Sequence, residues 1–209
     1  MKTKILISLL LLLLFSCHTK SPNTKAVNKE INKINKTKDD AEQLLKYFNS
    51  TKDSIYLSRA ENQIDSLIRR DINDIKLYQI KRNILRIRKR YDEFAKFMNE
   101  STSHFPDSPH AFFGAGLAYE KINNIESSKE MFQKSLRLFD QLIVKYPTVE
   151  NYFNRCLVVC FLDGKQTGLE EFEKIEKSGK FEKASIEAYK GSIVNFDRNK
   201  YIKAMFNNP

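Results

Sequence analysis

The chain contains few of the residues that interrupt helices, with six glycines and five prolines among 209 residues. It does not lack hydrophobic residues, which make up 41% of the sequence, so its composition excludes a disordered protein. Scarce helix breakers, together with abundant lysine, glutamate, leucine, isoleucine and phenylalanine, favour an all-α globular protein.

Histidine and cysteine, which catalytic and metal sites often use, occur only three times each. His18 lies near the N-terminus, and His104 and His110 flank a Pro-Asp-Ser-Pro turn. HExxH motifs, glycine-rich phosphate loops and nucleophile elbows are missing from the sequence. Cys156 and Cys160 lie one turn apart in a predicted helix, where disulfide geometry is unfavourable and further soft metal ligands are lacking. We therefore expect no enzyme activity, no cofactor and no metal, and we expect these two cysteines to be buried.

The longest hydrophobic run lies at the N-terminus, where residues 5–15 follow two lysines. Eleven residues are too few to span a bilayer comfortably and are typical of a signal-peptide core. Residues 14–17, Leu-Phe-Ser-Cys, resemble the lipobox of bacterial lipoproteins, although Phe15 replaces a residue that is often small. The resemblance implies cleavage before Cys17, acylation of its thiol and new amino group, and stable anchoring by two or more acyl chains. An ordinary signal peptide with a chance cysteine is the alternative.

A lysine- and asparagine-rich segment follows Cys17. Residues 18–40 contain six lysines and few hydrophobic residues, so we expect a mostly disordered tether. Its lysines either attract anionic headgroups or simply keep a spacer solvated. The predicted organisation is a signal peptide at 1–16, the lipidated cysteine with its flexible tether at 17–40, and a helical domain at 41–209. Because no acidic cluster follows the cysteine, we expect an outer-membrane lipoprotein that faces the periplasm.

Large apolar residues recur at a spacing of 34 residues. Tyr78 is followed by Phe112 at this interval and Tyr91 by Ile125, while Leu57 precedes Tyr91 by the same step. This is the period of the tetratricopeptide repeat, in which antiparallel helix pairs stack into a solenoid.

Residues 110–136 resemble one tetratricopeptide repeat most closely. Phe112 takes the place of its first aromatic residue, Gly116 its glycine, Tyr119 its tyrosine and Phe132 its second aromatic. A glycine inside a helix costs about 1 kcal/mol relative to alanine, so close helix packing must offset that cost. The resemblance implies an all-α, right-handed α-solenoid of about four helix pairs with closing C-terminal helices.

The preceding unit departs from the repeat pattern. Lys81 and Arg82 stand where the repeat has Leu-Gly, and they begin the densest basic run, residues 81–90. The export signal and the lack of interleaved aromatic residues argue against nucleic acid as a partner. The run is either a solvated basic face or a binding site for an anionic envelope ligand, such as a lipid headgroup or glycan. A formal net charge of +10 for the whole chain motivates the second interpretation.

Toward the C-terminus the helical pattern continues by periodicity alone. The second helix of the clearest repeat is expected to run on for about two extra turns before Pro147. Thr167 and Glu170 predict a capping box that opens a later helix. Residues 184–196 and 198–206 are expected to form two helices that close the solenoid.

Tetratricopeptide proteins hold a peptide, helix or loop of a partner in a groove lined by the first helix of each pair. The resemblance thus implies a periplasmic, membrane-anchored scaffold or accessory subunit with a protein or peptide partner. Phe113 would point into the groove as an aromatic anchor, unless it packs beneath the closing helices. From the family register, the groove-facing candidates are Lys76, Gln79, Asn83, Arg86, His110, Phe113, Leu117, Glu120, Phe153 and Leu157.

Overall fold

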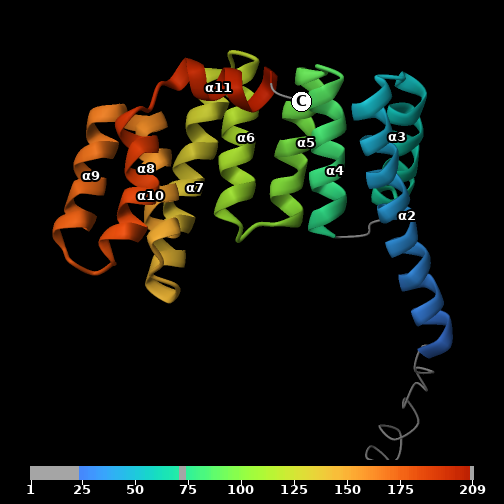
Figure 1. The fold of residues 1–209 in the computed structure, drawn as a ribbon, viewed down its shortest axis with the longest axis horizontal. Helices are drawn as coiled ribbons and strands as arrows, with labels where there is room; N and C mark the ends of the chain where they lie inside the picture. The colour runs from blue at the N-terminus through green and yellow to red at the C-terminus, as the bar shows by residue number, and fades with distance from the viewer. Residues whose placement is uncertain (1–23, 71–73, 208–209) are drawn as a thin grey trace, which may run out of the picture.

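The computed structural model describes residues 24–70 and 74–207, and within these ranges it contains ten α-helices and no strand. The helices are α2 (Thr24–Thr51), α3 (Ser54–Ile68), α4 (Ile75–Ile87), α5 (Tyr91–His104), α6 (Pro109–Lys121), α7 (Ile125–Lys145), α8 (Val149–Asp163), α9 (Lys165–Lys177), α10 (Lys183–Val194) and α11 (Arg198–Asn207). Consecutive helices from α2 to α10 run antiparallel and stand side by side in a single array, whereas α11 lies across them (Figure 1).

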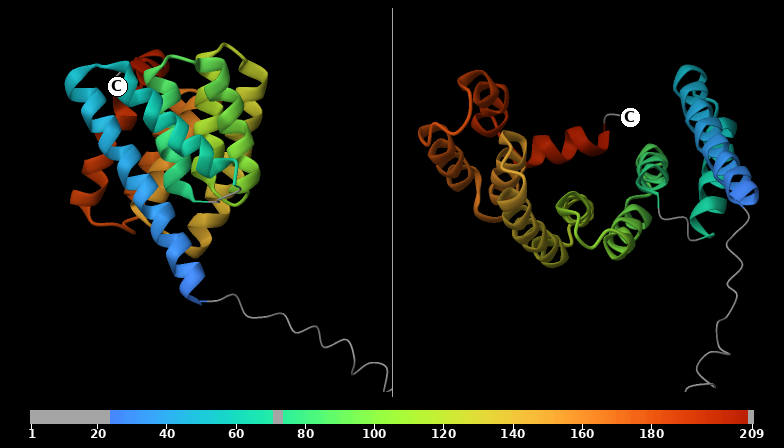
Figure 2. Two further views of the ribbon diagram at one scale, coloured as in Figure 1. Left: turned by 90° about the vertical axis from the view of Figure 1, so that its right-hand side faces the viewer. Right: turned by 90° about the horizontal axis from the view of Figure 1, so that it is seen from below.

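The array is a solenoid of four helix pairs, α2/α3, α4/α5, α6/α7 and α8/α9, in which each pair packs on the next. Helix α10 packs on α8 and α9, and α11 turns back across the inner side of the curve (Figure 2). The predicted all-α solenoid of about four helix pairs with closing C-terminal helices is confirmed. None of the described helices is both long enough and apolar enough to cross a bilayer.

The close approach of α6 and α7 explains the glycines in the clearest repeat. A Cβ atom built on Gly116 would lie 2.5 Å from Cε1 of Phe132, so only glycine lets the backbone rest on that ring. A Cβ atom built on Gly114 would likewise lie 2.6 Å from Cε of Met98 in α5. Phe132 stacks on Phe161 of α8 with ring centroids 4.9 Å apart, so the contact extends into the next pair. The buried area offsets the low helix propensity of the glycines.

Two hydrophobic clusters run along the array and meet at α4. The smaller cluster joins α2, α3 and the side of α4 that carries Leu77 and Ile84. The larger cluster begins at Leu85 on the other side of α4 and extends through α10 to Phe206 of α11. Each helix pair therefore buries its apolar surface against its neighbours, as expected for a solenoid.

The predicted flexible tether differs from the structure over residues 24–40, which form the first part of α2. A narrow apolar stripe, which includes Ile34, packs this helix against the smaller cluster. Nζ of Lys38 lies 2.5 Å from Oδ2 of Asp74. These contacts come from distant parts of the sequence, and a composition-based prediction of disorder does not include them. The expected signal peptide, Cys17 and the rest of the tether lie outside the described residues.

The predicted capping box at α9 is wrong. Helix α9 begins at Lys165, directly after Gly164. This glycine has a φ of 94° and is both the C-cap of α8 and the N-cap of α9. The hydroxyl of Thr167 donates instead to the carbonyl of Asp163 from within the first turn. The predicted extension of the preceding pair is confirmed, because α7 continues to Lys145.

Candidate partner-binding groove

The inner face of the solenoid is formed by α4, α6 and α8, and α11 lies across it (Figure 2). Tyr201 of α11 faces Phe113 of α6 and Phe161 of α8, with ring centroids 6.4 and 5.4 Å apart. Further along α11, the ring of Phe206 packs edge-on against Phe94 at 5.2 Å. Phe113 therefore packs beneath the closing helix, which is one of the two arrangements that the sequence left open.

A charged contact fixes the N-terminal end of α11 to α6. Nε and Nη2 of Arg198 each donate to an oxygen of Glu120 at 2.7 Å, and Nη1 donates to the carbonyl of Phe161 at 3.0 Å. The hydroxyl of Ser128 also donates to Glu120. Burial opposes ionisation of Glu120, but the Arg198 hydrogen bonds and charge outweigh it and lower the pKa of this carboxyl group. The predicted groove residue Glu120 thus has an intramolecular partner.

We expect Arg198→Ala to loosen α11 without unfolding the solenoid. The lost ion pair is bidentate, but solvent screens it because the Arg198 side chain is 41% exposed. Local opening should therefore become easier by about 1 kcal/mol, which speeds amide hydrogen exchange of α11 about fivefold. Lys203→Ala, at an exposed position of the same helix, serves as the control and should leave exchange unchanged. Equal exchange in both variants would contradict the assigned role of the Arg198 contact.

Four other predicted groove residues lie elsewhere or are covered. Nζ of Lys76 lies within 3.7 Å of two carboxylates of α2, so its side chain faces that helix. Leu117 and Leu157 are buried in the larger cluster, and Leu117 also borders a small cavity between α4 and α6. Phe153 packs on Tyr189 of α10, with ring centroids 4.7 Å apart.

The remaining candidates line the groove between α4 and α6. One cavity of about 100 Å³ is bordered by Gln79 and His110, and a smaller one of about 50 Å³ by Asn83 and Arg86. Arg82 borders both cavities, although the family register did not single it out. The sequence could have pointed to Arg82, because it stands where the repeat pattern has a glycine.

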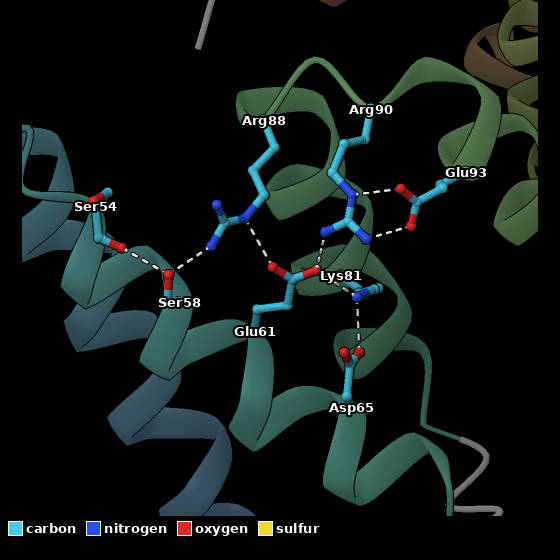
Figure 3. Close-up of polar contacts among 8 residues, drawn as sticks. All are labelled: Ser54, Ser58, Glu61, Asp65, Lys81, Arg88, Arg90 and Glu93. Atoms are coloured by element: carbon cyan, nitrogen blue, oxygen red, sulfur yellow. Dashed lines mark hydrogen bonds and ion pairs between the residues drawn. The ribbon is translucent and has the colours of Figure 1, made fainter.

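Half of the basic run is neutralised inside the protein (Figure 3). Glu61 of α3 accepts a hydrogen bond from Nζ of Lys81 at 2.9 Å and one from Nη1 of Arg90 at 2.6 Å. Nε of Arg88 lies 2.7 Å from the second oxygen of Glu61. Lys81 also pairs with Asp65 at 2.8 Å. This network joins α3 to α4 and the start of α5, so these cations serve the fold.

The predicted burial of Cys156 and Cys160 in α8 is confirmed. Helix α9 approaches them closely, because a Cβ built on Gly168 would lie 2.2 Å from Sγ of Cys160. Burial raises the pKa of Cys156 to about 12 and that of Cys160 to about 11. In residues 24–70 and 74–207, no group of three His, Cys, Asp or Glu side chains could hold a metal ion.

We expect both thiols to resist alkylation in the folded protein, since the reactive thiolate is scarce and the sulfurs are buried. In a Cys17→Ala variant at pH 8, iodoacetamide should modify neither residue over an hour and both after unfolding in urea. Mass spectrometry of the intact chain counts the adducts. Rapid labelling of the native protein would show that α8 and α9 separate readily.

No family model and no curated protein matches this sequence. Among solved structures, the chain is similar to a tetratricopeptide repeat protein from Parabacteroides merdae ATCC 43184, whose crystal structure was determined at 2.39 Å. The two are 15% identical, and the alignment covers 81% of this chain and 68% of the other with a TM-score of 0.41. By its own helix pairs, the described part of this protein is an α-solenoid, and its second and third pairs, which begin at Ile75 and Pro109, repeat at the 34-residue interval of tetratricopeptide repeats.

Proposed function

We propose that this protein is a non-enzymatic interaction scaffold, anchored to a membrane, whose inner face binds a helical or extended segment of a protein partner. The supporting observation is α11 itself, a helix that lies on this face through aromatic contacts and a bidentate ion pair. A surface that holds one amphipathic segment in this way has the shape and chemistry to hold another.

The anchoring part of the proposal rests on the sequence. Residues 14–17 resemble a lipobox, and acylation of Cys17 would place the solenoid at the periplasmic face of the outer membrane. Helix α2 connects this end of the chain to the rest of the solenoid. The scaffold would then present its groove to other envelope proteins as an accessory subunit.

The alternative function, binding of an anionic lipid headgroup or glycan through the basic run, has less support. Such a site needs several free cations on one surface. Lys81, Arg88 and Arg90 are instead engaged by Glu61, and Arg90 also pairs with Glu93. The charge that remains is better suited to a single anionic group than to a membrane surface.

Site-specific cross-linking tests anchoring and partner binding together. A photoreactive amino acid is introduced at Gln79, which is exposed in the groove, and as a control at Asn99, which is exposed on α5. Each is expressed in the native host with Cys17 intact or replaced by alanine. We expect one defined protein to be cross-linked from Gln79 alone, in the membrane fraction, and lost with Cys17→Ala. A soluble wild-type chain without a Gln79 adduct would contradict both parts of the proposal.

A further inference from the structure

The second helix pair, α4/α5, lacks the tight contact between a glycine and an aromatic ring that holds the third pair, α6/α7, together. Phe132 packs on Gly116 between α7 and α6. One repeat earlier, 34 residues back in each case, the corresponding residues are Met98 and Arg82. A charged side chain and a flexible thioether thus replace a glycine and a fixed ring, and both border the space between α4, α5 and α6.

Two cavities flank Arg82 and Met98. The smaller one is closed on one side by Met205 and Phe206 of α11. The larger one, of about 100 Å³, lies toward the beginnings of α4 and α6, at the end of the groove opposite α11 (Figure 1). A ligand would therefore enter at this uncovered end, which is bordered by Ile75, Gln79, Ser108 and His110.

Arg82 is half-buried and has no ion-pair or hydrogen-bond partner among the residues that the structure describes. Burial and the nearby charge of Arg86 lower the pKa of Arg82. Arg86 makes one hydrogen bond to the carbonyl of Met205, while its Nε is buried without a partner. No Asp or Glu of the described ranges borders either cavity. Two cations with unused donors are unfavourable in this setting, and a bound anion would relieve that cost.

We propose that Arg82 forms an anion-binding site in the groove and that the site takes a carboxylate from an acidic segment of the protein partner. This inference rests on the proposed function, because it names the chemistry of the segment that the groove binds. The planar guanidinium of an arginine matches the two oxygens of a carboxylate. Arg86, one turn further along α4, supplies a second cation.

The rest of the cavity favours a peptide over a lipid headgroup or a free phosphate. Tyr78, Met98 and Phe105 give the larger cavity an apolar wall, and Ile75 at its mouth is 52% exposed. Gln79 and Ser108 offer groups that can hydrogen-bond to a peptide backbone. A cavity of this size accommodates an acidic side chain, and its apolar surroundings suit neighbouring hydrophobic residues of the same segment.

The test uses random twelve-residue peptides displayed on phage and selected against the full-length protein in detergent micelles. We expect the enriched peptides to share an aspartate or glutamate next to hydrophobic residues. The strongest synthetic peptide should bind Arg82→Gln at least about tenfold more weakly than the wild type. Changing its acidic residue to the amide should have the same effect. Arg137→Gln, at an exposed position of α7, is the matched control and should bind like the wild type.

Four results would overturn the anion site. In the first, enriched peptides lack acidic residues or bind Arg82→Gln normally; the scaffold function then stands and only this inference fails. In the second, Arg82→Gln binds the peptides normally but loses binding to vesicles of three parts phosphatidylcholine to one part phosphatidylglycerol. In the third, Arg82→Gln melts several degrees below the wild type, which assigns Arg82 to the fold. If no peptide is enriched, the inference also fails, and the scaffold is judged separately by the Gln79 cross-link.

Discussion

Replacement of Gly116 by valine is expected to lower the free energy of unfolding by about 3 kcal/mol, near the upper end for overpacked cores. The added Cβ alone would lie 2.5 Å from the Phe132 ring, and two further methyl groups would have to fit in the same space. Phe132 cannot move aside, because it is 1% exposed and stacks on Phe161. Chemical denaturation followed by circular dichroism at 222 nm measures the loss.

Gly191→Ala in α10 is the matched control. A Cβ at this helical position would have no atom within 4 Å, so the change removes the helix penalty of glycine and meets nothing. We expect it to raise the free energy of unfolding by about 0.5–1 kcal/mol. Helix propensity alone predicts stabilisation for both variants, so the opposite signs identify close packing as the reason for glycine at residue 116. Equal effects would refute that explanation.

The clearest repeat could be predicted because its pattern is made of contacts within a single helix pair. Gly116 and Phe132 meet as the resemblance implied, and Asn123 adopts a left-handed φ of 58° in the turn between the two helices. The residues that make up this pattern lie within one 34-residue period. The same locality explains why the number of helix pairs could be counted from the sequence.

Helix α2 could not be predicted, because its first half is stabilised from far away. Arg70 pairs with Glu30 across 40 residues of sequence, and Lys38 pairs with Asp74 across 36. The apolar stripe that carries Ile34 is narrow and surrounded by lysine and asparagine. The low hydrophobicity of this segment predicted disorder. The helical spacing of its few apolar residues indicates the helix that the structure contains.

The groove was predictable only in part for the same reason. The sequence located its walls in the first helices and offered two positions for Phe113. It could not decide between them, because the contacts of α11 with Glu120 and Arg86 span 78 and 119 residues. In the sequence, Arg82 is marked by its charge at the position of a glycine, but only the structure shows that this charge lacks a partner among the residues of 24–70 and 74–207.

Glu61→Gln is expected to lower the free energy of unfolding by about 3 kcal/mol, the lower end of the usual cost of breaking a buried ion pair, because Lys81 keeps Asp65 and Arg90 keeps Glu93 as partners. The Glu61 side chain is 11% exposed and contacts Lys81, Arg88 and Arg90 at 2.9, 2.7 and 2.6 Å (Figure 3). The amide keeps the shape of the side chain but leaves three cations without their shared counter-charge. Glu100→Gln, which removes an exposed carboxylate 4.0 Å from Lys96, is the control and should change stability by less than about 0.5 kcal/mol.

The wild type and Glu61→Gln should also differ in how their free energy of unfolding depends on pH. Burial of Glu61 opposes ionisation, but the Lys81 hydrogen bond and the charges of Lys81, Arg90 and Arg88 outweigh it, so its pKa lies below the ordinary 4.5. The unfolded chain therefore takes up a proton at this carboxylate before the folded protein does. The stability that Glu61 supplies is complete above pH 4.5 and is lost as the pH falls through the lower folded-state pKa. Denaturation curves between pH 7 and pH 3 should thus show the wild type approaching Glu61→Gln in stability as the solution becomes acidic. A constant difference across this range would show that Glu61 acts through packing and not through its charge.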